Sequence, residues 1–120
     1  MYDDVPGRVT IAPEVLVAIA KLTTLSVPGV VRMVPTGIQG FMRRGATEGV
    51  LLEVNEECVH LDLFIAADAN ANLRQVGQKI QVEIARAIRD MVGMGVETIN
   101  VHIQDVVYPE LVADKVTRSP

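Results

Sequence analysis

Several features that whole functional classes require are scarce or missing in this sequence of 120 residues. There is no tryptophan, and phenylalanine and tyrosine contribute two residues each. This scarcity disfavours the aromatic platforms on which single-stranded nucleic acids and sugars stack. Positive charge is also in deficit, since 11 lysines and arginines face 15 acidic residues and leave a net charge of −4. We therefore expect no strong nucleic-acid binding, which needs a basic surface against the phosphates.

Cysteine and long apolar runs are equally rare. The single cysteine, Cys58, excludes an internal disulfide framework and fits a reducing cytoplasm. No apolar stretch approaches the roughly 20 residues that cross a bilayer, and the acidic opening MYDDVPGR lacks the apolar run of a signal peptide. We expect a cytoplasmic protein without direct membrane insertion, so any association with a membrane would be peripheral or through a partner.

The sequence does contain enough apolar residues to fold. Hydrophobic residues make up 49% of the chain and its mean hydropathy is +0.30, which is incompatible with intrinsic disorder. A chain of this length builds one core. We predict one α+β domain over residues 1–107 and a C-terminal tail over residues 108–120, because the tail contains two prolines and no full hydrophobic period.

Two segments have helical periodicity. The first starts at Pro13, with Ala12 as the predicted N-cap, and stops at the Val-Pro-Gly sequence of residues 27–29. The second starts at Asn72, which forms a capping-box-like pair with Gln75, and ends at Gly93. The apolar stripe predicted for the first helix consists of Val15, Ile19 and Leu22, with Leu16 and Ala20 alongside.

Alternating apolar residues predict the strands. A weak alternation covers residues 7–11, a short strand is predicted at 30–34, and stronger patterns cover 50–54, 59–65 and 99–104. The two middle runs form a predicted hairpin with a loop of about four residues. Keeping their apolar sets on one face places Val54 near Val59, Glu53 opposite His60 and Leu51 opposite Asp62.

The order of these elements sets the fold class. A strand, a helix and a strand in sequence imply a right-handed crossover between two parallel strands. Each helix has one predicted apolar stripe, so both should pack on the same face of the sheet. We predict a two-layer α+β domain in which a mixed sheet of four to five strands carries two helices on one face.

Four segments resemble the bacterial alkaline shock protein family, also called the envelope stress response family. They are Gly-Arg-Val-Thr-Ile-Ala-Pro-Glu-Val at residues 7–15, Val-Pro-Gly-Val at 27–30, Leu-Asp-Leu at 61–63 and Ile-Asn-Val-His-Ile-Gln-Asp-Val at 99–106. The resemblance implies a small cytoplasmic protein linked to cell-envelope homeostasis, acting through protein partners and held near the membrane by one of them. It implies no catalytic residue, so function must be sought on surfaces.

The face of the sheet opposite the helices is the first candidate interaction surface. Its predicted residues combine two apolar side chains with four polar ones: Leu51, Glu53, His60, Asp62, Phe64 and His102. An open sheet with a partly apolar outer face gains by being covered, which favours a protein partner or a homo-oligomer. Two imidazoles and a carboxylate are also zinc-ligand types, but we expect no metal and no cofactor. Cys58 near His60 is a candidate nucleophile, and we expect no catalysis from it.

The glycine-containing segment of residues 35–47 is the second candidate. Phe41, Met42, Arg43 and Arg44 join an apolar pair to two cations, a combination suited to an acidic partner or an anionic membrane surface. In the same segment, the sequence from Gly37 to Gly40 is similar to the glycine clamp of KH-type RNA binders. We therefore predict a non-catalytic interaction or scaffold module of the envelope stress response, with a KH-like RNA-binding module as the alternative.

Overall fold

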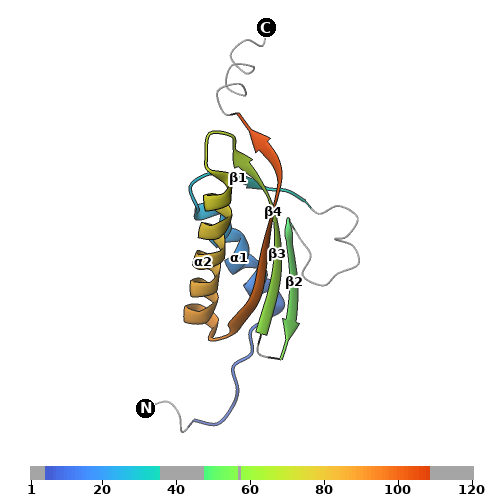
Figure 1. Ribbon diagram of the computed structural model, residues 1–120. Helices are drawn as coiled ribbons and strands as arrows, with labels where there is room; N and C mark the ends of the chain where they lie inside the picture. Colours follow the sequence, from blue (N-terminus) through green and yellow to red (C-terminus); the bar gives the residue numbers. More distant parts are fainter. Residues whose placement is uncertain (1–4, 36–47, 57, 109–120) are drawn as a thin grey trace.

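The computed structural model describes residues 5–35, 48–56 and 58–108. The elements follow in the order α1 (Pro13–Ser26), β1 (Val30–Met33), β2 (Val50–Asn55), β3 (Cys58–Asp68), α2 (Leu73–Val92) and β4 (Gly95–Val107). Both helices lie on one face of a four-stranded sheet (Figure 1). The predicted two-layer α+β fold class is confirmed.

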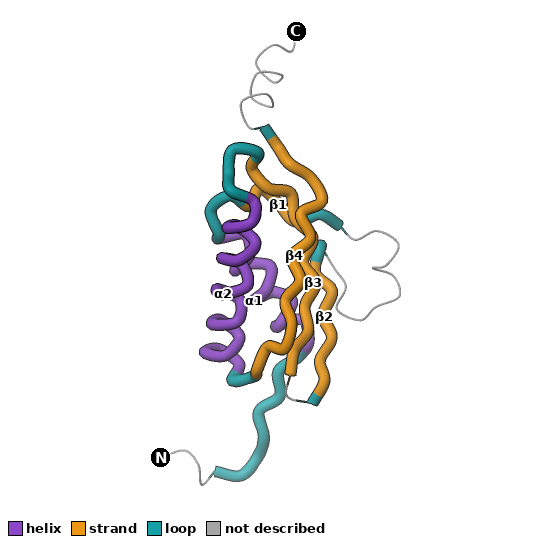
Figure 2. Tube along the Cα trace, viewed as in Figure 1, coloured by secondary structure: helices purple, strands orange, loops and turns teal. Residues whose placement is uncertain are grey.

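The long strand β3 organises the sheet. On one edge it pairs with β4, which runs parallel to it, and on the other edge with β2 and β1, which are antiparallel to it. Figure 2 shows β2 beside one half of β3 and β1 beside the other half. The sheet is therefore mixed, and the crossover through α2 joins two strands that are adjacent as well as parallel.

The predicted hairpin register is confirmed. Val54 pairs with Val59, and the pairs Glu53–His60 and Leu51–Asp62 lie on the other face of the sheet. The loop is shorter than the predicted four residues, because Asn55 already pairs with Cys58. The strand pattern did not reveal this last pair, since neither residue belongs to the apolar set.

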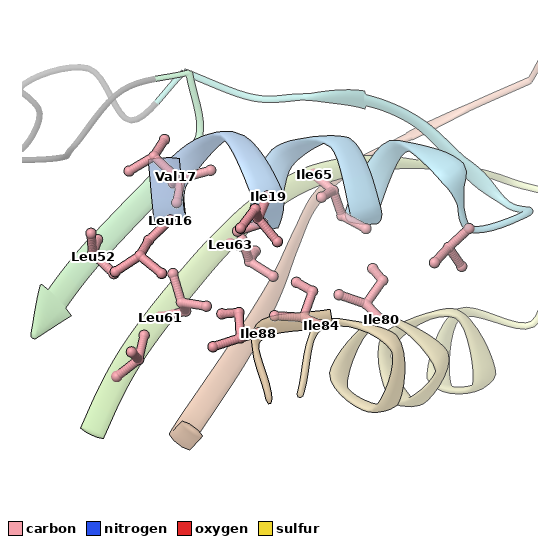
Figure 3. Packing of buried hydrophobic residues seen from close by; sticks show 14 of the residues in the cluster. Leu16, Val17, Ile19, Leu52, Leu61, Leu63, Ile65, Ile80, Ile84 and Ile88 are labelled. Carbon is pink, nitrogen blue, oxygen red and sulfur yellow. The ribbon is translucent and has the colours of Figure 1, made fainter. Parts of the chain in front are cut away.

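The hydrophobic core lies between the two helices and β3 (Figure 3). α2 contributes one side chain per turn, and β3 contributes every second residue. The fully buried members of these two sets are Ile80, Ile84, Ile88, Val59, Leu61, Leu63 and Ile65. α1 completes the layer with Leu16, Val17 and Ala20.

The helix ends follow their sequence signals. Ala12 is the N-cap of α1 and makes no side-chain cap hydrogen bond, while Pro13 occupies the first helical turn. Asn72 caps α2 through its side-chain oxygen, which accepts a hydrogen bond of 3.0 Å from the Gln75 backbone N–H. Gly93 ends α2 with φ of 80°, a conformation that favours glycine.

One prediction about the N-terminal part is wrong, and another is right for only some of its residues. Residues 7–11 form no strand, and Val9 is 91% exposed. Their alternation includes only two apolar positions, which is too little to bury one face of a strand. The predicted stripe of α1 is confirmed for Leu16, Ile19 and Ala20, which are buried, but Val15 and Leu22 are 45% and 66% exposed and Val17 is buried in their place.

We predict that Leu63→Ala and Ile84→Ala each lower the free energy of unfolding by about 2 to 5 kcal/mol, because each truncation leaves a cavity between α2 and β3. Both parent side chains are fully buried. Val82→Ala is the matched control, since Val82 lies on α2 but is 53% exposed. Chemical denaturation measures all three, and losses below about 0.5 kcal/mol at both buried sites would contradict the assigned core.

Candidate interaction surface

The outer face of the sheet, meaning the face turned away from α1 and α2, brings the sequence-predicted residues together. In β3 the outward positions His60, Asp62 and Phe64 alternate with buried neighbours and are only half-buried themselves. β2 places Glu53 and Leu51 beside His60 and Asp62, and β4 places His102 beside Phe64. All six predicted surface residues therefore belong to one face, built from three strands.

Asp62 is the centre of a hydrogen-bond network on this outer face. Its Oδ1 accepts from the Asn100 side-chain Nδ2 at 3.1 Å and lies 2.9 Å from His102 Nε2. An ionised carboxylate only accepts hydrogen bonds, so His102 Nε2 is the donor of this pair. The network fixes both the ring orientation and the tautomer of His102.

The ring of Phe64 stacks on the ring of His102. Their centroids are 4.6 Å apart and their planes differ by 13°. Phe64 and His102 are direct neighbours in the parallel pairing of β3 and β4, which explains the contact. His102 is thus held from its flat side by Phe64 and at its edge by Asp62.

His60 belongs to a second cluster. Its Nδ1 lies 2.8 Å from Thr98 Oγ1, and its Nε2 lies 3.1 Å from Glu97 Oε1. Glu97 reaches His60 because the register shifts there: Val59 pairs with Val96, but His60 pairs with Thr98. This bulge leaves Glu97 as an extra residue in β4. Glu97, Thr98 and Asn100 were not predicted as part of this surface, because the sequence contains no signal for the register between β3 and β4.

An ion pair closes one end of the outer face. Arg32 of β1 and Asp105 of β4 flank Ala66 of β3, and Arg32 Nη2 lies 3.5 Å from Asp105 Oδ2. Ala66 is fully buried although it occupies an outward position. The two paired side chains therefore cover the strand at this end, and the accessible part of the surface lies over the first half of β3.

The structure does not assemble the alternative zinc ligands. His102 contacts Asp62, whereas His60 contacts Thr98 and Glu97. Within residues 5–35, 48–56 and 58–108, no group of three metal-ligating side chains comes together. Both ring nitrogens of His60 are engaged by these contacts, so neither is directed at the Cys58 thiol.

The second candidate segment lies outside the described residues. This applies to Phe41, Met42, Arg43 and Arg44, and to the range 37–40 of the KH-like alternative. The flanking elements are described, and they are the strands β1 and β2. A KH clamp joins two helices, so these neighbours do not match the alternative. Among the described residues, no helix is both long and apolar enough to span a membrane.

Comparison with known proteins identifies the family of this two-layer domain. Residues 2–108 match the alkaline shock protein family, which is described as having a cell envelope-related function. The chain belongs to this family, and the resemblance of its four segments is thereby confirmed. It is also 27% identical over 101 residues to the uncharacterized protein YqhY of Bacillus subtilis strain 168, covering 81% of this chain and 75% of that protein.

Solved structures share the fold at low sequence identity. A nickel form of the MamM CTD has a TM-score of 0.55, and the match covers 77% of this chain and 96% of that one. A manganese form has a TM-score of 0.56, with coverage of 78% and 99%. Both are 14% identical to this chain, so the likeness concerns the fold alone.

We predict that Asp62→Ala lowers the free energy of unfolding by about 1 kcal/mol, because Asn100 and His102 lose a shared acceptor at a partly exposed site. Asp90→Ala on the far layer is the control, since the Asp90 side chain is 64% exposed and pairs with the adjacent Arg89. Urea denaturation measures both variants. If Asp62→Ala and Asp90→Ala change the free energy of unfolding equally, the Asp62 network adds nothing to stability.

We also predict that the protein binds no stoichiometric metal and that Cys58→Ser preserves the fold. The sole cysteine is half-buried, and serine has a similar volume. Elemental analysis of protein prepared without a histidine tag, chelator or added metal tests the first expectation, and circular dichroism tests the second. One equivalent of zinc that disappears in His60→Ala or His102→Ala would establish a metal site instead.

Proposed function

We propose that this chain is a non-catalytic interaction or scaffold module in the bacterial cell-envelope stress response or in envelope homeostasis. In this proposal residues 1–107 form the folded module, residues 108–120 form a tail, and no cofactor takes part. The module acts in the cytoplasm and associates with the membrane through a membrane-anchored protein partner. Membership of a family with a cell envelope-related function supports this reading.

The observation that carries the proposal is the composition of the outer face. Both helices cover the opposite face, and the outer face retains Leu51 and Phe64 as half-buried apolar side chains. Glu53, His60 and Asp62 surround them on the same strands. Apolar anchors inside a polar surround are the usual anatomy of a protein contact.

The hydrogen bonds of this outer face suit it to binding a partner. Asp62 holds Asn100 and His102, and Thr98 and Glu97 hold His60. Side chains that are fixed in this way lose little conformational freedom when a partner covers them. At His60 these contacts engage both ring nitrogens, one of which a general base would need free, whereas at His102 they engage Nε2 alone.

We predict that Phe64→Glu abolishes capture of the partner while Val82→Glu preserves it. The first variant puts a carboxylate into the outer face, and the second puts the same charge on an exposed position of α2. The measurement is a cross-linked pull-down from native cytoplasmic and membrane fractions, with nuclease treatment to separate RNA-mediated capture. The thermal midpoint of each variant reports whether it folds.

Leu51→Lys is a second outer-face variant for the case that Phe64→Glu does not fold. Leu51 pairs with Asp62, so an introduced ammonium has a carboxylate beside it and the sheet should remain intact. Loss of capture in this variant supports the outer face. If both folded variants capture the same proteins as the parent, the proposal fails and the segment from Phe41 to Arg44 becomes the better candidate.

A further inference from the structure

β4 presents a long free edge. Its 13 residues pair with β3 on one side, and no other strand of the described chain pairs with it. In Figure 1, β4 is the foremost strand, with α2 beside it. An unpaired strand edge offers backbone donors and acceptors to another strand.

The direction of these backbone groups follows from one hydrogen bond. The Gln81 side-chain Nε2 of α2 donates to the Ile99 carbonyl oxygen at 3.0 Å, so this carbonyl points away from β3. Backbone directions alternate along a strand, and the N–H and C=O of one residue point the same way. Val101 and Ile103 therefore also direct their N–H and C=O groups to the free edge.

The centre of β4 lacks the proline, lysine and bulges that protect free edges in other proteins, and the edge group that α2 engages, the Ile99 carbonyl oxygen, can accept a second hydrogen bond. Residues 98–103 have the sequence Thr-Ile-Asn-Val-His-Ile, without proline, lysine or any acidic residue. The two register shifts of the strand lie outside this segment, near Glu97 and near Gln104. Pro, Lys and bulges are the usual devices against edge pairing.

The flank of α2 above this edge leaves room for a neighbour. Gly77, Gln78 and Gln81 line a shallow groove there together with Val101 and Ile103. A Cβ added at Gly77 would make an ordinary contact with Val101, 3.9 Å from its Cβ. These three residues of α2 are small or uncharged, and among the described residues Arg74 is the one charged residue that lines the groove.

We propose that the β4 edges of two copies of this chain pair antiparallel about a two-fold axis near Val101. Such a pair matches residues 99–103 with themselves, because each face of this segment has one character. On the helix side Ile99, Val101 and Ile103 meet the same apolar set, and on the outer side Asn100 and His102 meet each other.

A second copy of the chain is a better pairing partner for the free edge of β4 than an unrelated strand. The three apolar side chains are only half-buried and already pack against the core. Self-pairing covers both exposed edges at once and joins the two cores under one continuous sheet. The networks around His60 and Asp62 lie between β3 and β4, so the pairing leaves them intact.

The pairing goes beyond the proposed function and uses a different part of the sheet. The free edge of β4 binds the second copy, while the outer face remains open for another protein. Two copies joined in this way present two outer faces on one continuous sheet. Partner capture and self-association therefore fail separately, and separate variants test them.

Hydrogen exchange of the unmodified protein tests the pairing directly. The backbone amides of Val101 and Ile103 should become protected as the protein concentration rises, in step with dimer formation in analytical ultracentrifugation. A protein that remains monomeric up to on the order of 1 mM would overturn the proposal. So would a dimer in which these two amides exchange as fast as in the monomer.

Val101→Pro provides the matching variant. Proline removes the N–H that points to the free edge, and edge positions of this kind tolerate proline. The dimer dissociation constant should rise about twenty-fivefold, because two symmetry-related hydrogen bonds are lost and each contributes on the order of fivefold. The denaturation midpoint confirms that the variant is folded.

Val54→Pro is the control on the opposite edge of the sheet. Gly49 accepts a hydrogen bond from Phe64 N–H, so odd-numbered residues of β2 face β3 and Val54 directs its N–H away from it. This variant should leave dimerisation unchanged. If Val54→Pro weakens the dimer and Val101→Pro does not, the edge assignment is wrong.

Discussion

The pairing of β3 on both of its edges is the constraint on which the rest of the structure depends. Strand side chains alternate between two faces, so burying Leu61 and Leu63 beneath the helices forces His60 and Asp62 outward. A slip by one residue would bury an imidazole and a carboxylate, at a large desolvation cost. The same register therefore specifies the core and the outer face, and neither can shift without the other.

Much of this arrangement could be predicted from the sequence. α2 has a single apolar stripe, an Asn72 cap and a terminal Gly93, so its hydrophobic periodicity and its start and stop signals define the same helix. The hairpin register follows from the apolar parity that pairs Val54 with Val59. The contacts between β3 and β4 could not be predicted, because no local pattern specifies a register across about 40 residues or a bulge that brings Glu97 to His60.

The errors near the N-terminus have a different cause. α1 is apolar on two sides, so periodicity alone does not decide which side is buried, and Val17 is buried where Leu22 was expected. At the end of β3, Ala66 and Ala67 are fully buried and extend the strand beyond the predicted run. Alanine contributes little to an apolar pattern, so its burial becomes visible only when the neighbouring strands are in place.

β4 connects the two proposed contacts physically. Asn100 and His102 extend from its outward positions to Asp62, while the intervening Val101 directs its backbone to the free edge. Pairing at that edge would hold β4 more firmly along β3, and with it the His102 ring against Phe64. Because an ordered contact surface loses less entropy on binding, self-association at the edge would favour partner binding at the outer face. The coupling needs only the alternation along β4, in which successive residues serve the outer face and the free edge. It requires no change in the conformation of the protein.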